Sequence, residues 1–533
     1  MTTPIGSRSP APAGELLPHA LHGLIAALAP LLIALALGAI AAALLRRRHL
    51  HWSWAPFALA LSLALAPMLG ATGPFVLVAS VAAAVRGRRR HREDLEAGAD
   101  LGRTARSRLT PLGTARRAAG HLADRRAAAR PRPARDTLVL GRDATGRAVC
   151  MPFGRELAGH ALVVGATGSG KTVTQTLIAE AAIADGRAVI AVDPKGDDGM
   201  RSRLAAAAAR AGRRFVEWTP DGPCSYNPYA RGGETEIADR LLAGEHFTEP
   251  HYLRQAQRYL GHAIRALRTC RREVSLAAVV ELLDPQALES LLRELSEEEA
   301  ARGHAYLDSL TPRQLRDLAG IRDRLAILAE SEVGRWLGAG GERFDLLAAC
   351  REQSVVVFRL EADSRPLIAQ MLGAAIVQDL QSTVAALQRS PAPTLVVIDE
   401  FSALGARHVT ALFGRARSAG VSLLLGTQEL ADLRLPGSER VLEQVMGNLS
   451  LLIAHRQVVP ASAELIGRLA GERGCWRVNW SSGGRTTRTR SSEPLLGGDL
   501  LAELPPGRAV LVGFGAARAV SVLDVHVPGG GGR

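Results

Sequence analysis

A glycine-rich loop that ends in lysine and threonine has the clearest chemistry in this sequence. Residues 165–172 read Gly-Ala-Thr-Gly-Ser-Gly-Lys-Thr and follow the short apolar run 161–164. A strand, such a loop and a helix form a P-loop, because glycines let backbone amides converge on phosphate oxygens. We expect Lys171 to reach the β- and γ-phosphates and the Thr172 hydroxyl to bind Mg²⁺. The nucleotide-binding residues are predicted to be Gly165, Ala166, Thr167, Gly168, Ser169, Gly170, Lys171 and Thr172.

The positions of lysine in the chain carry information because lysine is rare. Lys171 and Lys195 are its two lysines, and the other 63 of the 65 basic residues are arginines. An ammonium is a compact point charge, whereas a guanidinium is a planar fork. The two lysines therefore indicate positions that require the compact cation. Lys195 lies in Asp193-Pro-Lys-Gly-Asp, a composition typical of a tight turn, and structural and functional roles for this turn are equally compatible with the sequence.

Adjacent carboxylates follow a second apolar run. Residues 394–398 read Thr-Leu-Val-Val-Ile and lead into Asp399 and Glu400. Ligands collect at the carboxyl ends of strands in open α/β sheets, so we expect Asp399 to hold Mg²⁺ and Glu400 to polarise the attacking water as a general base. Gln428 follows the next predicted strand, where its amide could bond the γ-phosphate or the water and so sense hydrolysis.

Two arginines and the histidines complete the candidate residues. Arg415 and Arg417 lie between the carboxylates and Gln428, and an arginine supplied by a neighbouring subunit could stabilise transition-state charge. A solvated helix face explains either arginine equally well. His160 precedes the P-loop strand and is expected to be structural, because the histidines show no metal-ligand spacing. The five cysteines are scattered without a CxxC pair, which argues against a disulfide framework or a zinc site and fits a reducing compartment.

The segments that position these residues alternate between strand and helix patterns. Apolar runs at 137–140, 148–151, 187–193, 354–358, 394–398, 421–425, 449–453 and 509–512 are continuous, as expected for strands buried on both faces. Helical patterns separate most of these runs. The fold class predicted from this alternation is α/β with a doubly wound, mostly parallel sheet.

Residues 236–336 interrupt this alternation with helix signals alone. Leu253, Ala256, Leu260, Ile264 and Leu267 fall at helical spacing. Asp-Pro at 284–285 and Thr-Pro at 311–312 each predict an N-cap followed by proline in the first turn. We therefore expect an all-α insertion within the nucleotide-binding domain.

Two long uncharged segments come before the globular part. Residues 23–45 are long enough to cross a bilayer as a helix, and residues 52–85 exceed one straight crossing. Two crossings would leave the arginines at 46–48 outside, against the positive-inside rule. Three crossings, turning at residues 70–74, would keep both arginine clusters inside but make the last crossing short. We predict a membrane anchor at 23–85 with two, or else three, crossings.

A basic stretch follows the predicted anchor. Residues 86–135 contain 15 arginines against five acidic residues, which accounts for +10 of the net charge of +13. Such a stretch suits a juxtamembrane linker attracted to anionic lipid or a surface that faces nucleic acid. The lipid and linker interpretation is favoured, because aromatic residues that could stack on bases are absent.

Together these motifs resemble the type IV coupling proteins, the TraG/TraD-like ATPases of conjugation and type IV secretion. The resemblance rests on the P-loop, the Asp-Pro-Lys-Gly turn, Tyr-Asn-Pro at 226–228, Asp-Glu-Phe at 399–401, Thr-Gln at 427–428, Gly-Asn at 447–448 and a C-terminal pattern through 503–505. It covers roughly residues 20–525. It implies a RecA-like P-loop NTPase that binds ATP and Mg²⁺, with an all-α insertion domain and N-terminal transmembrane helices.

The resemblance also implies partners and roles. Such proteins form homo-hexamers in the bacterial inner membrane, with multi-pass anchors and a cytoplasmic ATPase domain. They couple a relaxase–DNA substrate to a type IV secretion channel and pump single-stranded DNA. By this resemblance Lys171, Glu400, Gln428 and Arg417 are the catalytic residues, and two crossings are favoured. The predicted organisation is a tail at 1–22, an anchor at 23–85, a linker at 86–135, a nucleotide-binding domain at 136–235 and 337–526, an insertion at 236–336, and a flexible tail at 527–533.

Two departures from the family pattern bear on the substrate. The uncharged segments are separated by only residues 46–51, so a sizeable extracytoplasmic domain is not expected, and residues 527–533 are not acidic. Substrate choice is then expected to rest on the insertion or on partners. Two other functions stay open: an FtsK-like or HerA-like translocase of double-stranded DNA, and a membrane scaffold that recruits protein substrates and uses nucleotide as a switch.

Overall fold

The structure is a computed structural model. It describes residues 32–41, 54, 57, 73–96, 137–144, 146, 148–152, 159–245, 247, 249–338, 341–404, 406–434, 440–480, 486–514 and 519–525. Both predicted tails, most of the predicted anchor and most of the basic linker lie outside these residues. The chain divides into two compact units, each of which is described by itself: one contains residues 1–131, 142–148 and 471–497, and the other contains the rest.

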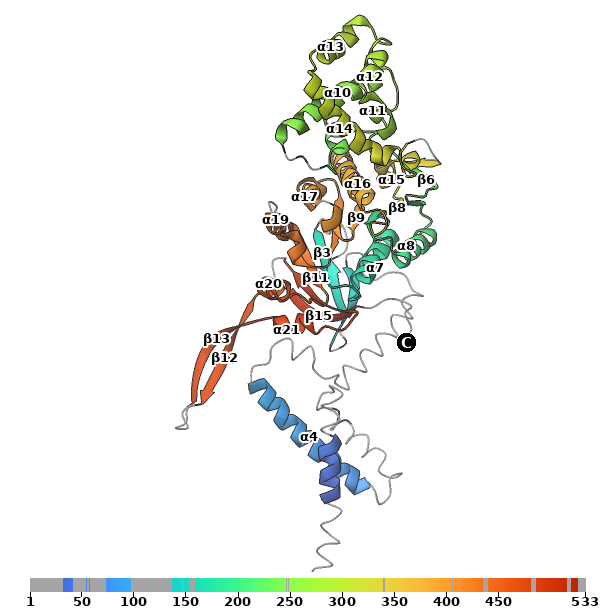
Figure 1. Ribbon diagram of the computed structural model, residues 1–533. Coiled ribbons are helices and arrows are strands. Elements are labelled where there is room, and N and C mark those ends of the chain that lie inside the picture. Colours follow the sequence, from blue (N-terminus) through green and yellow to red (C-terminus); the bar gives the residue numbers. More distant parts are fainter. Residues whose placement is uncertain are drawn as a thin grey trace, which may run out of the picture. The chain divides into compact units, whose positions relative to one another are not determined.

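An 11-stranded sheet organises the larger unit (Figure 1). In spatial order its strands are β2 (Ala148–Pro152), β1 (Thr137–Asp143), β15 (Ala519–Val525), β14 (Arg508–Gly513), β11 (Leu449–Ala454), β3 (His160–Val164), β10 (Val421–Thr427), β9 (Thr394–Ile398), β4 (Ala188–Asp193), β8 (Val355–Arg359) and β5 (Phe215–Trp218). The strands from β11 to β5 are all parallel, which confirms the predicted α/β class with a mostly parallel sheet.

One predicted strand runs the other way. Residues 509–512 were expected among the parallel strands, but β14 is antiparallel both to β11 and to β15. The connection from β14 to β15 spans only residues 514–518, which is too short for the crossover that a parallel pair needs. The sheet is therefore mixed at this side.

Helices cover the sheet on both faces, as the continuous apolar strands require. On one face α7 (Lys171–Ala184) and α8 (Asp198–Arg210) contribute Ile178 and Leu204 to a core with Val163, Val189 and Val357 from the strands. Strand residues of the opposite parity are buried as well, among them Leu162, Ile190, Val356 and Ile398. The long helix of the larger unit is α16 (Pro366–Leu387), and the shorter helices are α15 (Leu346–Arg351), η3 (Phe401–Leu404), α17 (Ala406–Thr410), α18 (Phe413–Ala416), η4 (Leu430–Leu433), α19 (Arg440–Asn448), α20 (Pro460–Ala470) and α21 (Gly498–Ala502).

A helical segment interrupts the sheet where the sequence predicts an insertion (Figure 1, green and yellow). Its helices are α9 (Glu234–Leu241), α10 (Pro250–Thr269), α11 (Leu276–Leu282), α12 (Pro285–Leu292), α13 (Glu297–Asp308), α14 (Pro312–Ala329) and η2 (Gly334–Trp336). The chain enters it after β6 (Cys224–Tyr226) and leaves it at β7 (Glu342–Phe344), which pair in parallel as a separate small sheet.

Two of these helices begin at the predicted N-cap residues. The Asp284 carboxylate accepts the backbone N–H of Gln286, and Thr311 forms a capping box with Gln314. On α10 four of the five residues at the predicted helical spacing are buried, with Leu260 and Ile264 both 0% exposed, and Leu253 is half-buried. The capping residues therefore mark where these helices begin, and the apolar stripe gives α10 its buried face.

The smaller unit contains two described helices and a ribbon. A helix at residues 32–41 packs on α4 (Gly73–Glu96) so tightly that a Cβ atom at Gly38 would lie 2.6 Å from the Ala79 carbonyl oxygen. Strands β12 (Glu472–Trp480) and β13 (Thr486–Pro494) pair in antiparallel. Within the described residues, no helix combines the length and the apolar character that crossing a membrane would take.

Helix α4 passes the predicted boundary between anchor and linker at residues 85 and 86. It continues through the first arginines of the basic stretch as far as Glu96. Arginine and glutamate are good helix formers. The start of the predicted linker is therefore helical.

Candidate active site

The glycine-rich loop joins β3 to α7 at the carboxyl end of the parallel strands. Gly168 and Gly170 have φ angles of +73° and +108°, a region that residues with a Cβ atom rarely adopt. Gly170 is the N-cap of α7 and makes no side-chain capping bond. The first turn of α7 therefore presents its backbone N–H groups to the loop, as an anion site at a helix N-terminus requires.

Backbone bonds from distant segments hold this loop in place. His455 donates its N–H to Val164 O at 2.8 Å, Ala166 donates to Arg456 O at 2.9 Å, and Gly507 donates to Ser169 O at 2.9 Å. The loop is thus fixed by the end of β11 and by the turn before β14.

His455 is a supporting residue that we did not predict. Its Nε2 lies 2.9 Å from Thr174 Oγ1, and its Nδ1 lies 3.2 Å from Arg508 O. Burial lowers the pKa of His455 to about 4, so the ring is neutral at pH 7. The signal in the sequence is its place two residues after the apolar run 449–453, at the sheet edge where ligands bind.

The two predicted nucleotide signatures meet at this edge. Lys171 Nζ lies 2.5 Å from Glu400 Oε1 and 3.2 Å from Asp399 Oδ1. Thr172 Oγ1 lies 3.4 Å from Asp399 Oδ2. Because β9 and β3 flank β10 in parallel, the residues after each strand lie at one edge. Lys171, Asp399 and Glu400 are 5–7% exposed, so they form a nearly buried charged cluster.

The turn at Asp193 brings the second lysine to the same cluster. Lys195 Nζ lies 3.1 Å from Glu400 Oε1. The Asp193 carboxylate accepts the N–H groups of Lys195 and Asp197, which closes the turn. Burial raises the pKa of Asp193, although these backbone bonds oppose the rise. Lys195 is thus in contact with the predicted general base, although the sequence left its role open.

Glu400 has an unusual backbone and an altered pKa. Its φ of 44° is in the left-handed region, which is uncommon for a residue other than glycine and costs of order 1–3 kcal/mol. Burial alone would raise its pKa, but the bond and charge of Lys171, the bond from Gln428 and the charge of Lys195 lower it below the usual value. Glu400 is therefore an anion at neutral pH.

Gln428 also reaches the loop, as its place after β10 predicts. Its Oε1 accepts a bond from Thr167 Oγ1 at 3.4 Å. Two residues earlier, a Cβ atom at Gly426 would lie 2.3 Å from Asp399 Oδ1 and 2.5 Å from Gln175 Nε2. Glycine at 426 thus leaves the space that the buried side chains of Asp399 and Gln175 occupy.

Arg415 and Arg417 are not brought to this cluster. Arg417 Nη2 lies 3.4 Å from Ser450 Oγ, and its charge acts on His160. Ser450 and His160 are at the beginnings of β11 and β3, the opposite edge of the sheet from the P-loop. Both arginines are exposed. Within its own chain, Arg417 therefore does not contact the P-loop residues.

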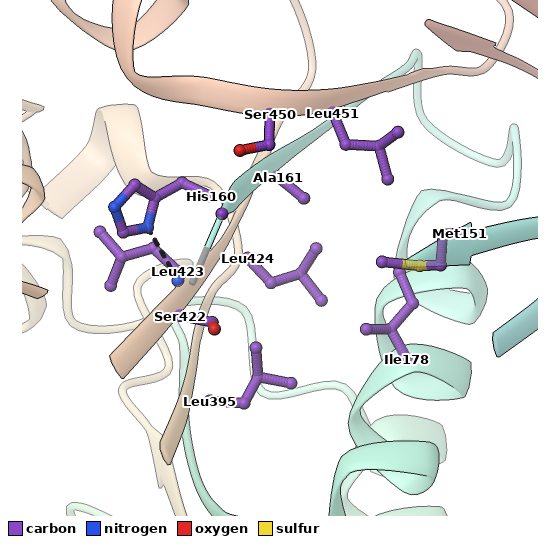
Figure 2. A pocket seen from close by; sticks show the side chains of 11 residues that line it. Met151, His160, Ala161, Ile178, Leu395, Ser422, Leu423, Leu424, Ser450 and Leu451 are labelled. Carbon is purple, nitrogen blue, oxygen red and sulfur yellow. Dashed lines mark hydrogen bonds between the residues drawn. The ribbon is translucent and has the colours of Figure 1, made fainter. Parts of the chain in front are cut away.

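A small apolar hollow lies near this opposite edge (Figure 2). It encloses about 100 Å³, and its lining includes Met151, Ile178, Leu395 and Leu451. The His160 ring borders it, accepts the Leu423 N–H at its Nδ1 at 3.2 Å, and packs on Phe413. Burial and the charge of Arg417 lower the pKa of His160 to about 4. These contacts give His160 a place in the core.

The donor set of the cluster suits Mg²⁺ and phosphate. Mg²⁺ prefers one or two protein oxygens together with phosphate oxygens and waters, and Thr172 and Asp399 offer a hydroxyl and a carboxylate. Neither Gln175 Oε1 nor Ser169 Oγ finds a hydrogen-bond partner within the described part of the chain, although both are buried. The described residues contain no group of three or more His, Cys, Asp or Glu side chains that could hold a metal.

Comparisons with known proteins bear on the fold and the family. An uncharacterised protein of Mycoplasma pneumoniae is 33% identical over 104 residues, which cover 19% of this chain and 69% of that protein. The bacterial conjugative coupling protein TrwBΔN70 in its unbound form gives a TM-score of 0.56 at 17% identity, covering 75% of this chain and 90% of that chain. TrwB in complex with ADP and Mg²⁺ gives 0.55 at 17% identity, covering 75% and 91%.

At these identities the structural likeness shows a shared fold alone. The family is shown by a separate match. The family model for the type IV secretion-system coupling protein DNA-binding domain matches residues 146–493. The match runs from the turn between β1 and β2 into β13. This chain belongs to the type IV secretion-system coupling proteins.

Proposed function

We propose that this chain is a membrane-anchored ATPase that moves DNA, as single strands joined to a relaxase, into a type IV secretion or conjugation channel. The observation that carries the proposal is the convergence of Lys171, Asp399 and Glu400 at the P-loop. This arrangement suits hydrolysis, because it combines a phosphate-binding cation with a metal-binding carboxylate and a separate base. TrwB, whose fold the chain shares, has been solved with ADP and Mg²⁺ and with an ATP analogue.

Each residue then has one role toward ATP. The loop from Gly165 to Thr172 binds the phosphates through its N–H groups, and Lys171 turns from Glu400 to the β- and γ-phosphates. Thr172 and Asp399 hold Mg²⁺, which supplies positive charge against the phosphate oxygens. Glu400 accepts a proton from the attacking water, and Gln428 contacts the water or the γ-phosphate.

We further propose that the active form is a homo-hexamer of RecA-like domains. Arg417 is exposed at the opposite sheet edge from the P-loop of its own chain. A head-to-tail ring could bring that edge to the P-loop of the next subunit, where Arg417 would stabilise transition-state charge. The RecA-like domain comprises residues 136–235 and 337–526.

The remaining segments supply anchoring and partners. Residues 23–85 are proposed to anchor the chain in the bacterial inner membrane by two or three crossings, with the basic residues 86–135 at anionic lipid and the ATPase domain in the cytoplasm. Residues 236–336 contain 17 acidic residues against 14 arginines in a chain of net charge +13. Its net charge of 14 − 17 = −3 is opposite in sign to that of the whole chain, which favours contacts with relaxase or channel proteins there.

Steady-state ATPase activity with and without DNA tests the proposal. We expect single-stranded DNA to stimulate phosphate release by the full chain in lipid. Stimulation by duplex DNA alone would indicate a translocase of double-stranded DNA. Activity without any response to DNA would contradict the motor and indicate a nucleotide-switched scaffold for proteins.

A further inference from the structure

Both lysines of the chain contact one carboxylate oxygen. Glu400 Oε1 lies 2.5 Å from Lys171 Nζ and 3.1 Å from Lys195 Nζ. The P-loop explains Lys171, whereas the proposed function assigns nothing to Lys195. A chain that uses arginine at 63 of its 65 basic positions places both exceptions on the same side chain.

The turn around Lys195 is fixed on several sides. The Asp193 Oδ1 atom accepts the Lys195 N–H at 2.9 Å, and Gly196 has a φ of +77°. From the neighbouring strand β8, Arg359 Nη2 donates to Gly196 O at 3.1 Å and lies 3.0 Å from Asp198 Oδ1. The backbone of Lys195 therefore has a defined place, although its side chain is 43% exposed.

The position of the turn in the sheet makes this contact possible. Strand β4 pairs with β9, and Asp399 donates its N–H to Val192 O at 3.1 Å. The residues that follow the two strands are thus neighbours across the sheet edge. Lys195 approaches Glu400 from the β4 side and Lys171 approaches it from α7, so the two ammonium groups are independent supports.

We propose that Lys195 is a positioning residue that keeps the Glu400 carboxylate facing the P-loop when Lys171 is engaged with nucleotide phosphates. The inference rests on the proposed function, in which Lys171 changes its partner. Glu400 would otherwise lose its closest cation at the step that needs it. A lysine suits this role because its ammonium is a point charge that holds one oxygen, whereas a guanidinium tends to bind both oxygens of a carboxylate.

An ordinary surface ion pair is the alternative. Half-exposed pairs contribute little, with a median of about 0–1 kcal/mol. The chain offers a matched control, because Arg265 and Glu234 form an ion pair at 2.5 Å in which the arginine is 47% exposed. That pair joins α10 to α9 and, among the described residues, shares no partner with Glu400 or with the turn at Lys195.

The first test compares the kinetics of the full chain with those of Lys195→Ala, Lys195→Arg and the control Arg265→Ala. We expect Lys195→Ala to lower kcat about ten-fold, equal to about 1.4 kcal/mol, with KM for ATP within about two-fold. Lys195→Arg should recover part of kcat, because it keeps the charge, but not all of it, because a guanidinium tends to bind both carboxylate oxygens. A kcat for Lys195→Ala equal to that of Arg265→Ala would overturn the proposal. So would equal losses in Lys195→Ala and Lys195→Arg, or a change confined to KM.

The second test needs no nucleotide. Melting temperatures are measured for the wild type, Lys195→Ala, Glu400→Gln and the double variant. Shifts that fail to add would support a direct coupling between the two side chains, and additive shifts would contradict it. A wild-type chain without ATPase activity would refute the proposed function, and the melting cycle would still decide whether Lys195 holds Glu400.

Discussion

Two buried charged clusters of the larger unit differ in how their partners are arranged. At the P-loop, the Glu400 carboxylate contacts two lysines, and one of them is the first residue of the helix that follows the phosphate-binding loop. The other cluster joins Arg240 of α9 to Asp379 of α16 at 3.2 Å, with 1% and 3% of each residue exposed. Both bury opposite charges, yet only the first is at a sheet edge where a ligand can enter.

In the second cluster, hydrogen bonds and ion pairs connect β6, α9 and α16. The Tyr226 hydroxyl donates to Asp379 Oδ2 at 2.7 Å, and Arg240 donates to Arg231 O at 3.0 Å and to Ser382 Oγ at 2.6 Å. Burial raises the pKa of Asp379, against the opposing charges of Arg240 and Arg231 and the bond from Tyr226. A network of this kind supports structure, whereas the P-loop cluster has a strained Glu400 and a cation that a phosphate can attract away.

Lys171→Ala is expected to have the largest effect. It removes the cation that is proposed to move from Glu400 to the nucleotide phosphates. We expect hydrolysis to fall by at least about 10³-fold, because the β- and γ-phosphates lose their cation. Phosphate release at saturating ATP measures the loss. Arg203→Ala is the control, because Arg203 bonds Glu180 on α7 away from the loop. Normal turnover in Lys171→Ala would contradict the assignment of the P-loop.

Glu400→Gln separates binding from chemistry at the same cluster. The amide keeps the shape but cannot accept the proton of water, so kcat should fall roughly 10²–10⁴-fold. A fluorescent ATP analogue should still bind. If the variant hydrolyses ATP at the normal rate, another group is the base.

Asp379→Ala tests the structural cluster. It leaves the Arg240 guanidinium buried without its carboxylate, which should lower the free energy of unfolding by about 3–5 kcal/mol. Tyr226→Phe removes one bond to a charged acceptor and should cost about 1.5–3 kcal/mol. Denaturant unfolding gives both values. The comparison fails if Asp379→Ala lowers kcat of the folded protein by more, expressed as a free energy, than it lowers the free energy of unfolding.

The smallest expected effect is on the pH dependence of the free energy of unfolding. It comes from His160, which is buried and uncharged. The pKa of His160 is about 4 in the folded chain and about 6.5 when unfolded, so between these values only the unfolded chain binds the proton. Stability is therefore lost as pH falls through this window, by about 2 kcal/mol at pH 5. His160→Gln should make unfolding less sensitive to pH between 7 and 5 than the wild type. The exposed His251→Gln should not, and equal slopes in all three proteins would refute the prediction.

The sequence predicted what depends on local pattern and strand order. Strands such as β9 and β10 were predictable because a run of buried residues is continuous in the chain. The meeting of Lys171 with Asp399 and Glu400 followed from parallel strands sharing a carboxyl edge. Helix α9 begins at Glu234, whereas the predicted insertion begins at residue 236, and capping alone does not fix such an end.

Contacts between distant segments could not be read from the sequence. His455 supports the loop through a neighbouring strand, and Gly426 is required by the side chains of Asp399 and Gln175 beside it. The contact of Lys195 with Glu400 depends on β4 and β9 being neighbours. The rarity of lysine marked the position, but strand order decided its partner.

The short parallel pair of β6 and β7 has a consequence for how such chains diversify. Tyr226 is paired with Phe344 and Cys224 with Glu342, so the helical segment leaves and rejoins the molecule within one pair of three-residue strands. The helical segment therefore enters and leaves at one place that is outside the strand order of the large sheet. The length of residues 227–341 can vary without changing that order, provided that α9 keeps Arg240, which is buried against Asp379 of α16.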